Sequence, residues 1–159
     1  MSALANYLLL GSVFSRLLLG QSVSVAPSET DRNTPGSFSL ALESPRGRAL
    51  VAIQWEFATP AALVIKAEDI AVGQAAQAAG KSLTCARKDG SNGGARYACI
   101  LQGGQTVIGN GPIAVVQYRV QVDVKGAPVH VAIEKVAAVS ADQKSVSLPN
   151  TEAIITIRD

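Results

Sequence analysis

The sequence predicts an all-β protein, an antiparallel β-sandwich of eight or nine short strands with one short helical turn. Two observations lead to this fold class. Apolar residues alternate with polar ones at the period of a strand, and Gly, Pro, Asn and Ser turns separate these segments at regular spacing. At 159 residues, with 48% hydrophobic and only 16% charged residues, the chain is suited to a single folded domain with a sizeable core.

The clearest strand pattern is ALVAIQWEF at residues 49–57, where Val51, Ile53, Trp55 and Phe57 share one face. Strands are expected at residues 22–26, 37–43, 49–57, 63–67, 82–87, 96–102, 112–124, 129–139 and 152–158, with a very short one inside GGQTVIGNG. The polar stretches SETDRNTPG and SADQKSVSLPN are expected to be turns or loops. The Ala-rich residues 69–80 predict one or two turns of helix, weakened by an internal glycine.

Residues 1–20 are apolar and lack an acidic residue, which favours a segment outside the fold. No Lys or Arg precedes the apolar run and Arg16 interrupts it, so the pattern departs from a standard secretory signal. It is also short and broken for a membrane-spanning helix. Three interpretations stay open: a weak or truncated signal peptide, which leads, an N-terminal anchor, or the tail of a longer precursor. The domain is expected over residues 21–159.

The two cysteines, Cys85 and Cys99, lie in strand-like segments on either side of the turn-rich sequence RKDGSNGGAR. A hairpin there would place them opposite each other, within reach of a disulfide. They lack the spacing of a CxxC redox motif, and two cysteines with one histidine make a poor zinc set. We therefore expect a disulfide and an oxidising compartment. Two buried free thiols remain the alternative.

No catalytic motif is present, so we expect neither an enzyme nor a cofactor. His130 alternates with valines in a strand and is expected to face solvent without a catalytic partner. Gly103, Gly104, Gly109 and Gly111 precede a strand, whereas a phosphate-binding loop precedes a helix. The acidic residues form no calcium loop and predict no metal site, although a structural calcium built from separate loops stays open. A net charge of +2, with scattered basic residues, disfavours nucleic acid.

Candidate binding residues come from the cysteine hairpin. Trp55 and Tyr118 share their strand faces with aliphatic residues and are expected in the core. Tyr97 is the one aromatic residue expected to be exposed. Together with the basic residues Arg87, Lys88 and Arg96 around the polar turn, it forms the candidate binding set.

A series of short segments, in a distinctive order, covers most of residues 23–158: VSVAPSE, GSFSLAL, AIQWEFATPAALVI, GKSLTC, ACIL and IGNGPIAVVQYRV. In this order they resemble the cohesin family, in particular a cysteine-bearing subset of secreted bacterial proteins. It implies a nine-stranded jelly-roll sandwich that is not catalytic. In cohesins, one sheet face docks a calcium-loaded pair of dockerin helices in scaffolds that handle polysaccharides. The chain itself carries no attached dockerin, linker-rich scaffold or neighbouring enzyme.

The leading hypothesis is therefore a secreted recognition module, at the cell surface or outside the cell, that binds a dockerin-type protein partner in a polysaccharide-related assembly. One alternative is a carbohydrate-binding module, for which Tyr97 is the sole good candidate ring. Another is a surface or filament subunit that uses residues 1–20 as its anchor. A fold by itself does not fix a function.

Overall fold

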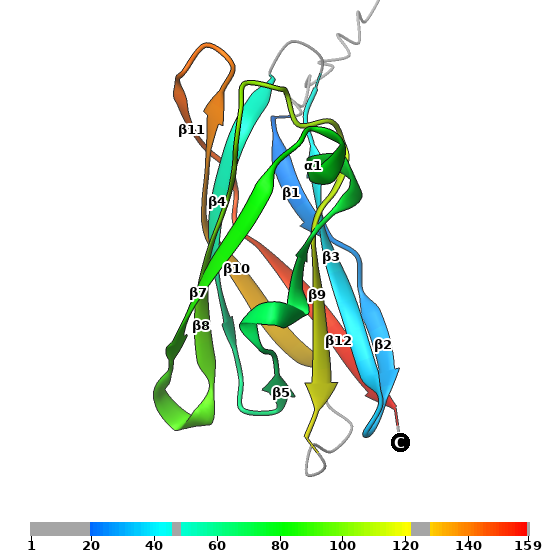
Figure 1. The fold of residues 1–159 in the computed structure, drawn as a ribbon. Helices are drawn as coiled ribbons and strands as arrows, with labels where there is room; N and C mark the ends of the chain where they lie inside the picture. Colours follow the sequence, from blue (N-terminus) through cyan, green and yellow to red (C-terminus); the bar gives the residue numbers. More distant parts are fainter. Residues whose placement is uncertain (1–19, 46–48, 122–127, 159) are drawn as a thin grey trace, which may run out of the picture.

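Two β-sheets packed face to face make up the protein (Figure 1), which confirms the predicted fold class. The structure is a computed structural model that describes residues 20–45, 49–121 and 128–158. The segment expected to be a signal or anchor, residues 1–20, lies outside the described residues except for Gly20. The end of the expected strand 112–124 also lies outside them, from residue 122 onward.

The first sheet, sheet A, is the smaller one. Its strand order is β1 (Ser22–Val25), β3 (Pro35–Glu43), β9 (Gly111–Val120) and β5 (Leu63–Val64), and β6 (Ile70–Val72) also pairs with β9. All of these pairs are antiparallel. The short helix α1 (Gln74–Ala78) follows β6 and contacts β9. The predicted helical turn is therefore present, although more than half of its expected range, residues 69–80, forms other structure.

The second sheet, sheet B, forms the other layer. Its order is β2 (Ser28–Asp31), β12 (Thr151–Arg158), β10 (Val129–Ser140), β4 (Leu50–Thr59), β8 (Ala95–Gln102) and β7 (Ser82–Asp89), and β11 (Ser145–Ser147) also pairs with β10. Two 3₁₀ turns, η1 (Ala67–Asp69) and η2 (Ser91–Gly93), complete the regular elements of the described residues. The turn η2 closes the β7–β8 hairpin.

The described residues contain twelve strands, more than the eight or nine expected. The additional ones are β2, β6 and β11, which have three or four residues of weak alternation each. The strand β2 has the polar sequence SETD, and it pairs in parallel with the C-terminal strand β12. Arg158 then reaches across to Asp31, with 3.1 Å between Nε and Oδ1. Such pairing depends on a partner far along the chain, so local pattern does not reveal it.

The core lies between the sheets and is built from the alternating positions predicted from the sequence. Trp55 is 2% exposed and Tyr118 is 1% exposed, which confirms both as core residues. Tyr118 passes directly over Gly36, where a Cβ would come within 2.4 Å of the ring carbon Cζ. Glycine at this position therefore lets the ring lie flat against β3.

Candidate functional site

The four residues predicted to form a binding set lie on opposite sides of sheet B. In the β7–β8 hairpin, Arg87 is opposite Tyr97 and Lys88 is opposite Arg96. Since successive side chains of a strand point to opposite faces, the first pair points toward sheet A and the second pair toward the outer face. The structure therefore does not bring the four together into one site.

Tyr97 is buried at 1% exposure, so the expectation that it is exposed was wrong. Its ring stacks on that of Phe57 with 4.7 Å between centroids, and its hydroxyl donates a hydrogen bond to the backbone carbonyl of Ile65. The physical reason is the alternation of side chains along a strand. Tyr97 lies two residues before the buried Cys99 and therefore points to the same face. Tyr97 is thus part of the core and does not provide an exposed ring.

The substitution Tyr97→Phe is expected to lower the free energy of unfolding by about 1–2 kcal/mol, since it leaves the buried carbonyl of Ile65 without this donor. Urea denaturation measures the effect as a lower midpoint with an unchanged slope. The matched control is Tyr118→Phe, which removes a hydroxyl that is hydrogen-bonded, at 3.2 Å, to the part-buried Ser28 hydroxyl. An equal or larger loss in the control would contradict the role given to the Tyr97 hydroxyl.

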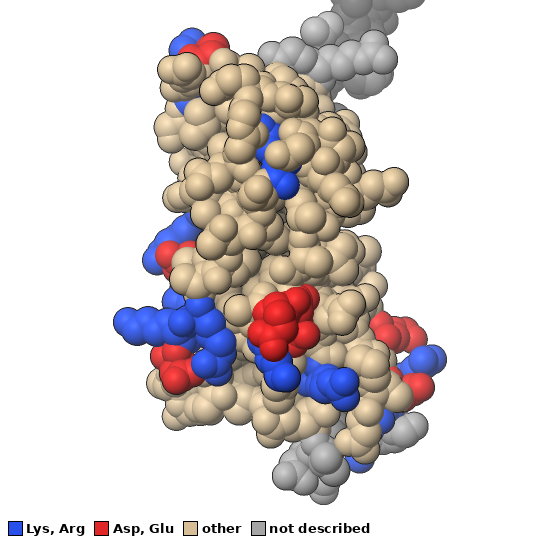
Figure 2. All heavy atoms as spheres, viewed as in Figure 1, with Lys and Arg blue, Asp and Glu red and all other residues tan. Residues whose placement is uncertain are grey.

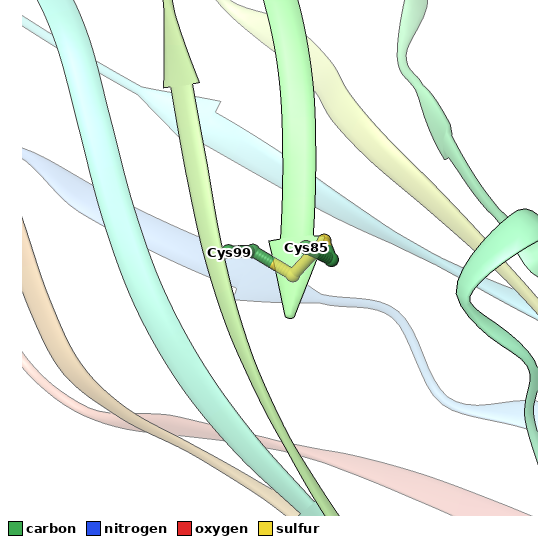
Figure 3. The surroundings of a disulfide bond; sticks show 2 residues. All are labelled: Cys85 and Cys99. Carbon is green, nitrogen blue, oxygen red and sulfur yellow. A yellow bond between two sulfur atoms is a disulfide. The ribbon is translucent and has the colours of Figure 1, made fainter. Parts of the chain in front are cut away.

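The cysteines pair as the hairpin pattern predicted. Cys85 and Cys99 are opposite each other in the β7–β8 register and form a disulfide with an S–S distance of 2.06 Å (Figure 3). Cys99 is 3% exposed and Cys85 is partly buried against the same core. The bond therefore links the edge strand β7 covalently to β8.

Small and apolar side chains form much of the outer face of sheet B. The outward positions at its centre are Ala52, Gln54, Ala98, Ile100, Ala137 and Val139. Val139 is 39% exposed, one of the few large apolar side chains that are exposed among the described residues. Because most of these side chains are short, the face holds two shallow hollows of about 140 and 240 Å³, which meet at Gln54 and Ile100.

A cluster of charges borders the second hollow, with Glu56 at its centre. The Oε2 atom of Glu56 accepts from Nζ of Lys135 at 2.9 Å and from Nη1 of Arg96 at 3.1 Å. Arg96 also lies 3.8 Å from the carboxylate of Glu134. The hydrogen bond from Lys135 is the largest influence on the pKa of Glu56. Desolvation opposes it and the hydrogen bond from Arg96 supports it, so that the pKa lies below its usual value of 4.5. The carboxylate therefore stays ionised at neutral pH.

Lys135 reaches Glu56 because β10 contains a bulge. The register with β4 shifts between Glu134 and Ala137, and Lys135 has a left-handed φ of 51°. Val129, Val131 and Ile133 point inward before the bulge, and Val136 and Ala138 do so after it. A bulge commonly re-aims a side chain in this way.

Sequence reasoning missed Glu56, Glu134 and Lys135 as members of a surface cluster. The signal for the bulge was present in VHVAIEKVAAV, where two consecutive polar residues break the alternation between Ile133 and Val136. No signal of this kind exists for Glu56, whose neighbours across the sheet come from distant segments. Of the predicted basic residues, only Arg96 takes part in the cluster.

The remaining sequence expectations concern histidine and glycine. His130 is exposed, as predicted, and its Nδ1 lies 3.0 Å from the carboxylate of Glu152. The glycine loop before β9 is held by Lys81, whose Nζ donates to the carbonyls of Gly103 at 2.7 Å and Gly104 at 3.1 Å. Burial lowers the pKa of this lysine. A strand follows the loop, as expected for a turn.

Among the described residues, no group of three or more His, Cys, Asp or Glu side chains is arranged to hold a metal ion. No helix within this part of the chain has the length and apolar character needed to cross a membrane.

Comparison with solved structures identifies the architecture. A cohesin of Clostridium thermocellum, solved in a type I cohesin–dockerin complex, superposes with a TM-score of 0.72 at 11% identity, covering 87% of this chain and 99% of the other. A non-cellulosomal cohesin from the archaeon Archaeoglobus fulgidus gives a TM-score of 0.67 at 13% identity, covering 88% and 92%. The chain has the cohesin fold.

A third cohesin extends the agreement. The sixth cohesin of scaffoldin B from Acetivibrio cellulolyticus, solved with a Cel5 dockerin mutant, gives a TM-score of 0.68 at 11% identity and covers 87% of this chain and 98% of the other. No protein-family model matches the chain, and no curated protein matches it in sequence. The likeness to cohesins is thus carried by the three-dimensional arrangement of the strands.

Proposed function

We propose that the protein is a non-catalytic recognition module that binds a dockerin-type protein partner through the outer face of sheet B. The observation that carries the proposal is a cohesin-like sandwich with an outer face of small apolar side chains and a charge cluster at its border. Solved structures of similar fold include cohesin–dockerin complexes. These support the class of partner without identifying it.

The chemistry of the outer face suits a partner that presents a helix. Ala52, Ala98 and Ala137 allow the backbone of a partner to approach closely, and the two hollows accept apolar side chains that project from one helical face. The charges of Glu56 and Lys135 at the border would set the orientation of the partner. A stable complex of this kind buries about 1,600 Å² in total.

An extracellular location accompanies the proposal. The disulfide between Cys85 and Cys99 is of a type that persists in oxidising compartments. We assign the domain to residues 21–159 and propose that residues 1–20 direct export or anchor the domain at the cell surface.

The carbohydrate-binding alternative gains no support from the rings. The five aromatic residues that the structure describes are all buried, at 3% exposure or less: Phe38, Trp55, Phe57, Tyr97 and Tyr118. Stacking on a sugar requires an exposed ring, and the residue expected to provide one is in the core. The filament-subunit alternative rests on residues 1–20 alone.

Capture of a partner from culture supernatant tests the proposal. The full chain is immobilised, exposed to the secreted proteins of the source organism in calcium, and then washed with EDTA. We expect a protein that carries a dockerin to bind in calcium and to elute with EDTA, because the dockerin helices of the cohesin family are calcium-loaded. Failure to capture any dockerin-bearing protein would count against the proposal.

A further inference from the structure

A separate pocket, here called the edge pocket, lies between the two sheets, away from the two hollows on the outer face of sheet B. The edge pocket has a volume of about 240 Å³ and is lined by Leu63, Val64, Arg87, Tyr97 and Gln121, among others. It lies where β5 comes close to the β7–β8 turn (Figure 1). Figure 2 shows charged side chains gathered over this half of the visible face, whereas the half over α1 is mainly uncharged.

The walls of the edge pocket combine an apolar surface with one cation. Val64, at 38% exposure, is among the few large apolar side chains exposed in the described part of the chain, and it lines the pocket beside the buried Leu63. Arg87 supplies the only charge among the described lining residues, and its side chain is 45% exposed. A ligand would therefore meet a guanidinium group on one side and aliphatic carbon on the other.

Arg87 lies opposite Tyr97 in the β7–β8 register, and both residues line the edge pocket. The Tyr97 hydroxyl donates its proton to the Ile65 carbonyl, so it does not compete with Arg87 as a donor to a ligand. Tyr97, and then Asp89, raise the pKa of Arg87. Arg87 is thus a charged donor at the pocket, and a guanidinium carries five N–H groups.

The ion pair with Asp89 shows that Arg87 donates to a carboxylate. The Asp89 carboxylate pairs with Nη1 of Arg87, yet Asp89 is 81% exposed. Exposed ion pairs of this kind contribute little to stability, so a ligand can displace Asp89 at small cost. A carboxylate held inside the pocket would gain the bidentate geometry that guanidinium favours, together with apolar contact to Val64 and Leu63.

We propose that the edge pocket binds a small organic monocarboxylate, with its carboxylate on Arg87 and its aliphatic body against Leu63 and Val64. Asp89 acts as an internal competitor for the guanidinium. The same chemistry is available in a free short-chain acid and in a carboxylate attached to a larger molecule, and a probe of each kind distinguishes the two.

Titration of the full chain with pentanoate, followed by amide chemical shifts of Ala61 and Ala95, tests the proposal. We expect saturable shifts with a dissociation constant on the order of millimolar. Neutral pentanamide, which keeps the shape and loses the charge, should bind at least about tenfold more weakly. Glucuronate serves as the probe for a polymer-derived carboxylate. Tighter binding of glucuronate than of pentanoate would indicate a carboxylate attached to a larger molecule, and weaker binding would indicate a free short-chain acid.

Three variants complete the experiment. Arg87→Gln should weaken pentanoate binding by at least about tenfold, and Asp89→Asn should strengthen it by about two- to fivefold because the competitor is removed. Lys88→Gln, on the same strand but the opposite face, should leave binding unchanged. Absence of saturable shifts for both pentanoate and glucuronate, equal binding of pentanoate and pentanamide, or an equal loss in Lys88→Gln would overturn the proposal. None of these outcomes bears on the outer face of sheet B.

Discussion

Removal of the disulfide by the double substitution Cys85→Ala and Cys99→Ala is expected to lower the free energy of unfolding by about 3 kcal/mol. The cysteines are 14 residues apart in sequence, and the closed loop restricts the unfolded chain more than the folded one. The β7 strand is an edge strand that pairs with β8 alone within sheet B. Without the bond, we expect this hairpin edge to open first.

Urea denaturation of the wild type with and without reductant provides the measurement. The reduced wild type should unfold at the same midpoint as the double variant, and the double variant should not respond to reductant. Intact mass after alkylation without reductant should show no modified cysteine in the wild type. Two alkylated thiols, or a midpoint that reduction does not move, would contradict the structural role of the bond.

Local alternation predicted the fold because each sheet has one face in the core. The pattern Val51, Ile53, Trp55 and Phe57 determines which side of β4 is buried, and the same rule holds in β3 and β9. It failed for β2, whose polar residues are ordered by β12 at the other end of the chain. Pairing between strands so far apart along the chain produces no recognisable pattern in the local sequence of either strand.

The candidate sites were harder to predict, for two different reasons. The prediction that Tyr97 is exposed rested on its position near a turn. Its spacing of two residues from Cys99, which places both side chains on the same face of the strand, was visible in the sequence and indicated burial. The outer face of sheet B was missed because alanines such as Ala98 and Ala137 carry no distinctive chemistry. They acquire a role only when the register of β10, β4 and β8 places them side by side.

The substitution Gln54→Arg is expected to abolish most partner binding. Gln54 is exposed on the outer face of sheet B and borders both hollows. An arginine there places a long charged side chain where apolar side chains of the partner would insert. Disrupting a central position of an interface in this way is expected to cost about 2 kcal/mol or more of binding free energy. Gln117→Arg is the matched control, because Gln117 is an exposed residue of β9 on sheet A.

The central claim is that the outer face of sheet B is the docking face. Isothermal titration calorimetry of a captured, dockerin-bearing protein against the wild type, Gln54→Arg and Gln117→Arg tests it most directly. We expect Gln117→Arg to bind as the wild type does and Gln54→Arg to bind at least about 30-fold more weakly. Wild-type affinity in Gln54→Arg, together with a loss in Gln117→Arg, would place the docking face on the other sheet and contradict the claim.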